Sequence, residues 1–471
     1  MYDSNGVLTG HYDNQVDDYK QDHFQFHWTQ QYNSSWSSTI GLNYTYGRGY
    51  YEEYNDLWAT QNITFGDEVN FDYLQIKPLV IGGTTIDTTE NISRKWLDNN
   101  FYVGTFSLNY DSNQTNAVFG GSYSTYNGDH FGNLIWAQYA SNAAPNHRFY
   151  ENNADKKDFN LYTKVTQQLG TAWTVYADVQ FRTIAYNSIG TVKGPEPIAI
   201  DDNLSFFNPK AGITYRASEA SRLYLSYAKA QREPNRSDYE NGTPKPESLN
   251  DFEAGWRFKK EKVQLQANLY YMDYENQLVL TGALDAVGEP IRTNSGDSYR
   301  FGLEIEAAIQ FAEQWVWQPN LALSSNKNKD FYFKRDGQLQ NLGTTNISYS
   351  PNVVGASNLV FAPSTVFRAA LLSKYVGEQF MGNIDAELSK LEAYFTNDIN
   401  ISYVWTPNSW IKEAQFSLLV NNIFNVLYTS NGYFYTFDDD YSVAGVVTTI
   451  EGVGYYPQAG TNFLMGATFR F

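Results

Sequence analysis

Two histidines spaced four residues apart are the first candidates for chemistry in this sequence. On a helix, His23 and His27 would share one face and could hold a metal ion. They are interleaved with Phe24, Phe26 and Trp28, and such a period of two is typical of a strand. Residues four apart on a strand lie ~13 Å apart, too far for one ion with ligand bonds of ~2 Å. We therefore expect two polar strand residues and no metal site.

The other histidines and one acidic run give weaker signals. His11, His130 and His147 fall in stretches predicted as loops, where each is open to interpretation as a haem ligand. The run at 438–440 is Asp-Asp-Asp, and carboxylate oxygens suit calcium. The run lacks the glycine-punctuated pattern of a calcium loop, so the sequence favours a solvated loop tip.

Two aromatic clusters are the best candidates for binding a ligand. Both fall in stretches predicted as outer loops, near residues 48–58 and 433–437. Aromatic rings there can stack on catecholates, sugars or the face of a corrin. The alternative is that the rings pack loops together or form a belt at a membrane surface. The predicted ligand-binding residues are Arg48, Tyr51, Tyr54, Trp58, Tyr433 and Tyr435.

The sequence contains no recognisable catalytic motif. Cysteine is absent, which excludes thiol chemistry and disulfides. No nucleophile elbow, phosphate-binding loop, dinucleotide fingerprint or zincin helix is found. A net charge of −18 argues against nucleic acid as a partner. We predict a protein that is not an enzyme and has no cofactor; a membrane-barrel enzyme with acid, His and Ser at its rim is the alternative.

The elements that carry these residues are strands. Apolar and polar residues alternate over 173–181, 263–271 and 301–311, and the apolar faces are aliphatic in the middle and often aromatic at the ends. No apolar run approaches the roughly 18 residues of a membrane helix. Aromatic girdles flanking an aliphatic band are typical of a barrel in a bilayer. The predicted fold class is all-β, an antiparallel transmembrane up-and-down β-barrel.

Short and long connections alternate along the chain, as in a membrane barrel. Short connections are expected at 33–35, 111–114, 169–171, 217–220, 259–261, 312–314, 363–364 and 407–413. Long connections are expected at 47–96, 128–157, 187–204, 233–248, 276–297, 327–351, 380–392 and 427–460. This gives about 17 strands, an odd number, and Met1 is not followed by a signal peptide. We expect a barrel that lacks an odd number of N-terminal strands.

Several short motifs follow one another between residues 205 and 471. They are NPKAG at 208–212, DFEAGW at 251–256, LYYMDY at 269–274, Asn294 before GLEIE at 302–306, VNNIFN at 420–425 with Tyr428, and YPQAG at 456–460 before FRF at 469–471. In order and spacing they resemble the barrel of the TonB-dependent outer-membrane receptors. Residues 1–204 support a barrel by strand pattern alone, so 1–471 is expected to form one partial barrel domain.

The resemblance implies a 22-stranded barrel around an N-terminal plug, with a segment that binds TonB. Neither the plug nor that segment is found in this sequence, so TonB would be a partner through the missing N-terminal region. The resemblance also places Arg300, Glu304 and Glu306 in the lumen, against a plug or simply in solvent. Haem-uptake members carry an FRAP box where this chain has QREPN at 231–235, a departure that argues against haem.

The expected function is the import of a scarce nutrient across the outer membrane of a Gram-negative bacterium. By resemblance the ligand is a metal chelate such as a ferric siderophore, or cobalamin, with an oligosaccharide or a peptide as the alternatives, and the other partner is outer-membrane lipid. The alternatives are a passive porin-like or adhesin barrel, or a non-functional fragment without a plug.

Overall fold

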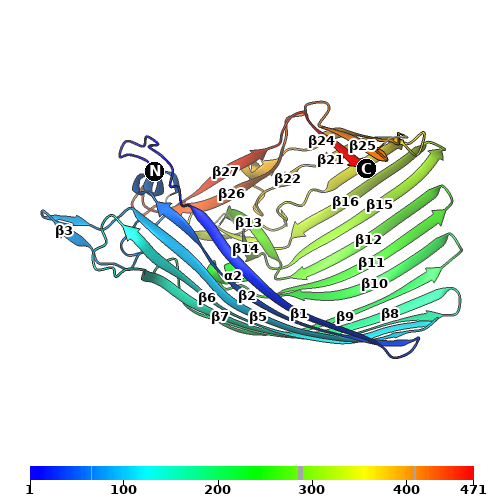
Figure 1. Cartoon of the computed structure of the whole chain (residues 1–471), viewed down its shortest axis with the longest axis horizontal. Helices are drawn as coiled ribbons and strands as arrows, with labels where there is room; N and C mark the ends of the chain where they lie inside the picture. The colour runs from blue at the N-terminus through cyan, green and yellow to red at the C-terminus, as the bar shows by residue number, and fades with distance from the viewer. Residues whose placement is uncertain (65, 285–289, 408–409) are drawn as a thin grey trace. The chain divides into compact units, whose positions relative to one another are not determined.

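The computed structural model describes residues 1–64, 66–284, 290–407 and 410–471 (Figure 1). The chain divides into unit 1, residues 1–165 and 178–207, and unit 2, residues 166–177 and 208–471. Within the described residues, seventeen strands of 9 to 23 residues and the two-residue β19 (Thr345–Asn346) form the main sheet. The predicted all-β antiparallel fold and the predicted number of strands are confirmed. The expected connections 276–297 and 407–413 include residues that lie outside the described ones.

Unit 1 consists of long antiparallel strands. Antiparallel ladders join each strand to the next long strand along the chain: β1 to β2, β2 to β5, and β5 to β6. The strands are β1 (Val16–Gln31), β2 (Trp36–Asn55), β5 (Asn91–Asp111) and β6 (Thr115–Ala137), with β7 (His147–Leu169), β8 (Trp173–Val192) and β9 (Glu196–Arg216) continuing into unit 2.

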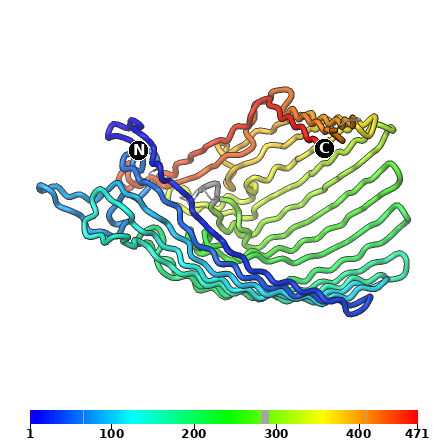
Figure 2. The backbone as a smooth tube through the Cα atoms, viewed as in Figure 1, coloured from blue at the N-terminus to red at the C-terminus, as the bar shows by residue number. Residues whose placement is uncertain are grey.

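Unit 2 continues the same next-neighbour order. Figure 2 traces short turns at one end of its strands and longer excursions at the other. All ladders from β9 to β28 are antiparallel. The strands are β10 (Ser221–Arg232), β11 (Glu247–Lys260), β12 (Val263–Glu275), β15 (Ser298–Ala312), β16 (Trp315–Asn328), β20 (Val353–Phe361), β21 (Phe367–Val376), β24 (Tyr394–Trp405), β25 (Glu413–Asn421) and β28 (Asn462–Arg470).

The long connections of the chain carry small hairpins and short helices. The hairpins are β3 (Leu79–Ile81) with β4 (Thr84–Ile86), β13 (Leu278–Leu284) with β14 (Pro290–Asn294), β17 (Tyr332–Arg335) with β18 (Gln338–Asn341), β22 (Gln379–Phe380) with β23 (Lys390–Leu391), and β26 (Thr429–Asp439) with β27 (Thr448–Pro457). The helices are α1 (Leu57–Ala59), η1 (Thr60–Thr64), α2 (Arg236–Glu240) and η2 (Glu387–Ser389). None of them, among the described residues, has the length and apolar content needed to cross a membrane.

The two faces of the strands differ in polarity, as the alternation predicted. On β2 and β5, exposed Ile40, Leu42 and Phe106 share one face. Next along that face, Tyr44 stacks on Tyr102 with ring centroids 4.6 Å apart. An apolar stretch that ends in paired aromatic rings is the pattern of a barrel surface at the edge of the lipid.

The strands of unit 1 are about twice as long as a bilayer requires. A tilted transmembrane strand needs about 9–11 residues, whereas β6 and β7 each have 23. Three long connections are therefore shorter than predicted. The predicted connection 47–96 is observed as 56–90, 128–157 as 138–146, and 187–204 as 193–195. The reason is that a strand outside the bilayer has no need of an apolar face, so its alternation disappears while its ladder continues.

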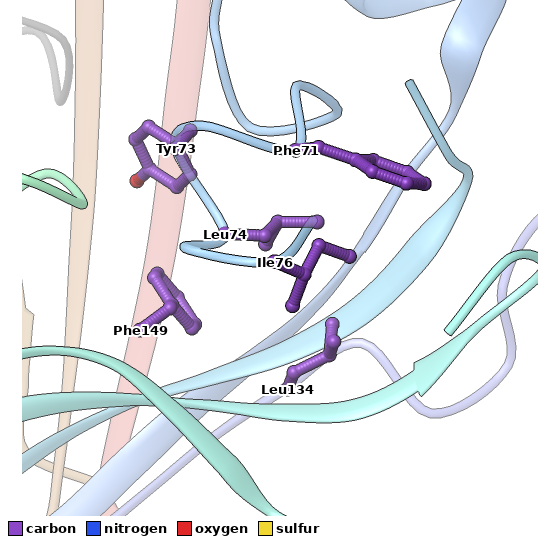
Figure 3. Packing of buried hydrophobic residues seen from close by; sticks show 6 residues of the cluster. All are labelled: Phe71, Tyr73, Leu74, Ile76, Leu134 and Phe149. Carbon is purple, nitrogen blue, oxygen red and sulfur yellow. The ribbon is translucent and has the colours of Figure 1, made fainter. Parts of the chain in front are cut away.

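A compact apolar cluster fixes the long connection of unit 1 to the extended strands. Figure 3 shows Phe71, Tyr73, Leu74 and Ile76 of that connection against Leu134 of β6 and Phe149 of β7. The backbone is fixed as well, because the Gln75 side chain donates to the Phe149 carbonyl at 2.7 Å.

A glycine makes the approach of this connection to the β8–β9 turn possible. Gly194 has φ +76°, and a Cβ there would lie 2.4 Å from the carbonyl oxygen of Tyr73. Only glycine fits both the backbone conformation and the close contact.

In unit 2, a buried polar network joins three long connections. The side-chain oxygen Oδ1 of Asn383 accepts from the Ser348 N–H at 3.0 Å and from the Asn328 side-chain amide at 3.3 Å. The Asn383 amide and the Ser348 hydroxyl both donate to the carbonyl of Leu280. Because these polar groups are buried, their mutual hydrogen bonds are what makes the packing tolerable.

Truncating the ring at the centre of the unit 1 cluster tests how the connection is held. Phe149 has no exposed surface, and Phe149→Ala should cost about 3–5 kcal/mol of local stability through lost burial and a cavity. Amide hydrogen exchange at residues 71–76 should become faster while the exchange in β5 stays slow. Val80→Ala is the matched control, because Val80 lies in the same connection and is 71% exposed. Unchanged protection of 71–76 in Phe149→Ala would show that the cluster does not hold the connection.

Candidate functional site

The first predicted cluster lies on a strand and a short helix instead of a loop. Arg48, Tyr51 and Tyr54 belong to β2, and Trp58 belongs to α1. Because side chains alternate along a strand, Arg48 and Tyr54 share one face of β2 and Tyr51 lies on the other. The expectation that these residues form one loop cluster is therefore wrong in its placement.

On the first face, the predicted residues are engaged with their neighbours. The Arg48 guanidinium lies 5.4 Å from the ring centroid of Trp96 and forms an ion pair with Asp98 at 3.4 Å. The Tyr54 hydroxyl donates to Glu90 at 2.7 Å. These contacts favour the packing alternative for Arg48 and Tyr54.

The same face holds a second arginine that the sequence analysis did not single out. Arg94 forms an ion pair with the buried carboxylate of Glu52 at 2.6 Å, and its guanidinium lies 4.3 Å from the Tyr50 ring centroid. Tyr12 also donates to Glu52, at 2.5 Å. Arginines stacked on rings and paired with acids stiffen this extended part of the sheet.

On the second face, Tyr51 is part of a group that includes a half-buried lysine. The Lys95 ammonium lies 5.2 Å from the Tyr51 ring centroid and 2.7 Å from Glu53 Oε1. Tyr73 lies nearby, and burial raises the pKa of its hydroxyl to about 12. Lys95 is opposite Tyr51 in the β2–β5 ladder, a relation that only the register reveals.

Trp58 packs against the N-terminal residues. Its ring centroid lies 5.1 Å from that of Tyr2, and its indole covers Gly6, where a Cβ would approach within 2.3 Å. The ring of Trp58, a predicted binding residue, therefore packs against Tyr2 and Gly6 of the same chain.

An open polar pocket of about 640 Å³ lies in unit 1 between residues 67–88 and the β8–β9 turn. Four carboxylates and a single lysine are on its rim: Asp67, Asp72, Asp87, Glu196 and Lys193. These carboxylates are exposed, so the pocket has the character of a solvated opening.

The second predicted cluster forms a row of aromatic rings on the hairpin β26–β27 of unit 2. Tyr433, Tyr435 and Phe437 lie on one face of β26, with successive ring centroids 6.3 and 6.4 Å apart. Successive ring planes differ by only 19° and 17°. Tyr456 of β27 adds a fourth ring, 5.9 Å from Tyr433 and tilted by 49° to it. We call these four residues the aromatic platform.

Two glycines on the facing strand allow the rings to lie flat. Gly454 is opposite Tyr433 and Gly452 is opposite Tyr435 in the hairpin register. A Cβ at either glycine would lie 2.3 Å from the Cζ of the facing tyrosine. Each tyrosine ring therefore covers bare backbone, and the opposite side of the ring is the one on which a planar ligand would stack. Tyr435 and Phe437 are 39% and 43% exposed.

The opposite face of the hairpin anchors it. Phe434 is buried with Met381 and Leu391, and the Tyr349 hydroxyl donates to the Gly432 carbonyl at 2.7 Å. Burial raises the pKa of Tyr349 to about 12, so this hydroxyl stays protonated at physiological pH. The platform is thus presented on a fixed support.

The hairpin β17–β18 contacts the outer part of β26–β27 through polar groups. We call this set of contacts the clasp. Arg335 forms an ion pair with Glu451 at 2.7 Å, and Lys334 forms one with Asp438 at 3.3 Å. Asp336 and Thr449 exchange two hydrogen bonds of 2.7 and 2.8 Å.

The acidic run at 438–440 takes part in these contacts and in the turn. Asp438 accepts from the Thr449 hydroxyl, and Asp439 accepts from the backbone N–H groups of Tyr441 and Ser442. The hydrogen bond from Thr449 and the nearby Lys334 ammonium hold the pKa of Asp438 below its usual value of 3.8. The carboxylates of Asp438 and Asp439 are committed to internal partners, as in a structured loop tip.

Two of the histidines have ordinary structural partners. His23 Nδ1 lies 2.9 Å from Thr45 Oγ1, and His147 Nε2 lies 3.0 Å from the Leu74 carbonyl. His130 and His147, expected in loops, lie on β6 and β7. In the described residues, His, Asp and Glu form no group of three that could hold a metal.

Arg300, Glu304 and Glu306 lie on β15, on the face opposite Phe301 and Ile305. The Arg300 guanidinium donates to Ser350 at 2.9 Å and to Asn326 at 3.3 Å. Both glutamates are exposed. These three residues therefore share the polar face of the unit 2 sheet, where Arg300 joins β15 to a long connection.

These features define an antiparallel membrane-barrel wall with ligand-binding candidates on its long connections, and comparisons with known proteins agree. The model of the family described as TonB dependent receptor-like, beta-barrel, matches residues 2–426. The chain belongs to this family, which confirms the resemblance found in the sequence.

Individual relatives are distant. The catecholate siderophore receptor Fiu of Escherichia coli K12 is 22% identical over 302 residues, which cover 60% of this chain and 35% of the receptor. The closed-form crystal structure of Fiu from E. coli K12 has a TM-score of 0.62 at 16% identity, covering 98% of this chain and 65% of that one. The ferric citrate transporter FecA has a TM-score of 0.63 at 14% identity, covering 96% of this chain and 62% of that one. This chain thus spans about a third of the curated receptor and just under two thirds of the solved chains.

The clasp between the two hairpins predicts a defined response to acid. The pKa of Asp438 in the folded chain is lowered from its usual value of 3.8. The stability that its carboxylate gives to the clasp is therefore complete above pH 3.8. It is lost as the pH falls through the lowered pKa. Asp438→Asn should remove the charge at every pH. Hydrogen exchange at residues 448–451 should therefore accelerate in the variant at neutral pH, and in the unaltered chain only in strong acid.

Asp440→Asn is the matched control for this prediction, since Asp440 is exposed beside the same turn. If Asp440→Asn accelerates exchange as much as Asp438→Asn does, the effect comes from the net charge of the tip and the ion pair with Lys334 has no specific role.

Proposed function

We propose that this chain forms barrel wall and outer loops of an active importer in the outer membrane of a Gram-negative bacterium. The proposed cargo is a ferric siderophore or a similar metal chelate, with cobalamin as the other nutrient to test. Membership of the TonB-dependent receptor-like family supports this proposal. The named relatives support it too, since they include a catecholate siderophore receptor and a ferric citrate transporter.

The observation that carries the choice of ligand is the aromatic platform. The ring planes of Tyr433, Tyr435 and Phe437 are nearly parallel, and the two tyrosine rings are backed by glycine. Such a surface gains most from ligands that present flat rings of their own, because offset stacking adds about 0.5–1.5 kcal/mol per ring pair beyond burial. Aryl-bearing chelates therefore suit the platform better than chelates without rings.

Transport would require energy and further protein. We propose that the polar face carrying Arg300, Glu304 and Glu306 borders the transport path, and that TonB acts through protein outside these 471 residues. The chain would perform no covalent chemistry, so it is proposed to be a transporter component and not an enzyme. Outer-membrane lipid would surround the apolar face of the strands.

The platform can be tested by removing its rings. Tyr433→Ala combined with Tyr435→Ala should weaken binding of a ferric catecholate complex about tenfold, the loss expected for ~1.4 kcal/mol of stacking. Binding is measured by quenching of intrinsic fluorescence in detergent micelles. Tyr441→Ala is the matched control, because Tyr441 lies at the tip of the same hairpin and is 76% exposed.

Two further ligands, ferric citrate and cobalamin, are measured with the same variants as comparisons. Ferric citrate has no aryl ring, so its binding should be unaffected by the double variant. Equal binding of the ferric catecholate to the double variant and the unaltered chain would refute the platform as its site. Tight cobalamin binding without any ferric catecholate binding would refute the siderophore proposal.

A change at the glycine floor tests the geometry while keeping both rings. In Gly454→Val, the new side chain occupies the space beneath Tyr433, since even a Cβ would lie 2.3 Å from its Cζ. The ring must tilt away from the plane of Tyr435, and affinity for the ferric catecholate should fall toward that of the Tyr433→Ala/Tyr435→Ala double variant. Retained affinity would mean that ring orientation does not matter for binding.

A further inference from the structure

Three arginines form one row across neighbouring strands at the short-turn end of unit 2. Arg216 of β9 is opposite Arg222 of β10, and Arg222 is opposite Arg257 of β11. Adjacent strands are ~4.8 Å apart, so the three Cα atoms span only about 10 Å. Lys259 lies two residues farther along β11, on the same face and nearer the turn.

The row lies on the polar face of the sheet. Its neighbours Leu223 and Leu225 point to the opposite, apolar face and are 46% and 58% exposed. Because Arg222 alternates with these leucines, lipid that covers the apolar face cannot reach the row. The partner of the row must therefore come from the polar side.

Within the described residues, few internal partners balance these charges. Arg216 forms an ion pair with Glu219 of the adjacent turn at 2.5 Å, but Glu219 is 93% exposed. The Arg257 guanidinium lies 5.1 Å from the Tyr224 ring centroid. The nearest acid in the same register row is Glu306, reached from Arg257 only across Gln266 of the intervening strand.

Without a bound partner, the row of arginines lowers the stability of the sheet. Like charges directly opposite each other on neighbouring strands destabilise the pair, and here Arg222 has a like charge on both sides. The whole chain is strongly acidic, with a net charge of −18, so this concentration of positive charge is contrary to the overall balance. A local charge pattern that costs stability and opposes the net charge indicates binding of an anionic partner.

We propose that the row Arg216–Arg222–Arg257 is a docking surface for an acidic polypeptide segment on the polar face of the sheet. A single small anion would engage only one or two guanidiniums. An extended chain repeats its side chains every ~6.6 Å on one side, so consecutive carboxylates on that side can pair with successive arginines along the row. Arginine suits this role because its planar fork binds a carboxylate through two parallel hydrogen bonds.

The test uses the 471-residue chain in detergent micelles and a fluorescent oligoglutamate peptide. Fluorescence anisotropy should show binding that weakens as salt is raised. The variant Arg216→Gln/Arg222→Gln/Arg257→Gln should lose at least about tenfold in affinity, since each guanidinium–carboxylate pair contributes to the complex. Arg368→Gln is the matched control. Arg368 of β21 lies on the same polar face near a short turn and is exposed, but it is opposite Ser402.

Stability separates docking from a structural role of the row. Arg222→Gln removes two like-charge contacts, so its midpoint of thermal unfolding should rise while peptide affinity falls. If the midpoint drops instead, Arg222 supports the fold and the proposal is overturned. The proposal is also overturned if the triple variant binds the peptide as the unaltered chain does, or if Arg368→Gln loses as much affinity.

Inorganic phosphate distinguishes an acidic segment from a general anion site. It should compete weakly, because one phosphate reaches only one or two of the guanidiniums. Row-dependent binding of inorganic phosphate without binding of the peptide would overturn the proposed docking surface in favour of a small-anion site.

Discussion

The need to satisfy every backbone N–H and C=O within a bilayer governs this structure. In hydrocarbon, no water replaces a missing hydrogen bond, so strands can cross only when both of their edges are paired. The next-neighbour ladders from β1 to β6 and from β9 to β28 meet this requirement for the interior strands. In the described residues, β1 pairs only with β2 and β28 only with β25. The outer edges of these two strands therefore each need a partner before they can lie in lipid.

Where the strands leave the bilayer, this constraint relaxes and other interactions replace it. The extended parts of β2 and β5 are held together by arginine–aromatic contacts and ion pairs, such as Arg94 with Tyr50 and Glu52. In unit 2 the long connections are joined by the hydrogen bonds around Asn383 and Ser348. Water competes for polar contacts outside the membrane, so burial of Asn383 and Phe434 is what makes these supports firm.

The sequence predicted the parts of the fold on which the bilayer acts. Alternation over 263–271 and 301–311 predicts β12 and β15 correctly because one face of each strand must be apolar there. It did not predict the outer halves of β2, β8 and β9, which have polar residues on both faces. The candidate residues Tyr433 and Tyr435 were found from their type. Their platform was not, because the opposing Gly452 and Gly454 become neighbours only through the hairpin register.

The platform and the arginine row share a physical logic, since each gives up sheet stability for access. A glycine opposite a tyrosine loses cross-strand packing and costs backbone entropy, yet it frees one side of the ring. Arginine opposite arginine adds repulsion, yet it places three guanidiniums within reach of one extended chain. A sheet selected for stability alone would have β-branched residues at 452 and 454 and a carboxylate opposite Arg222. Both proposed sites therefore rest on departures from the most stable cross-strand pairs, which the type of a single aromatic or charged residue does not reveal.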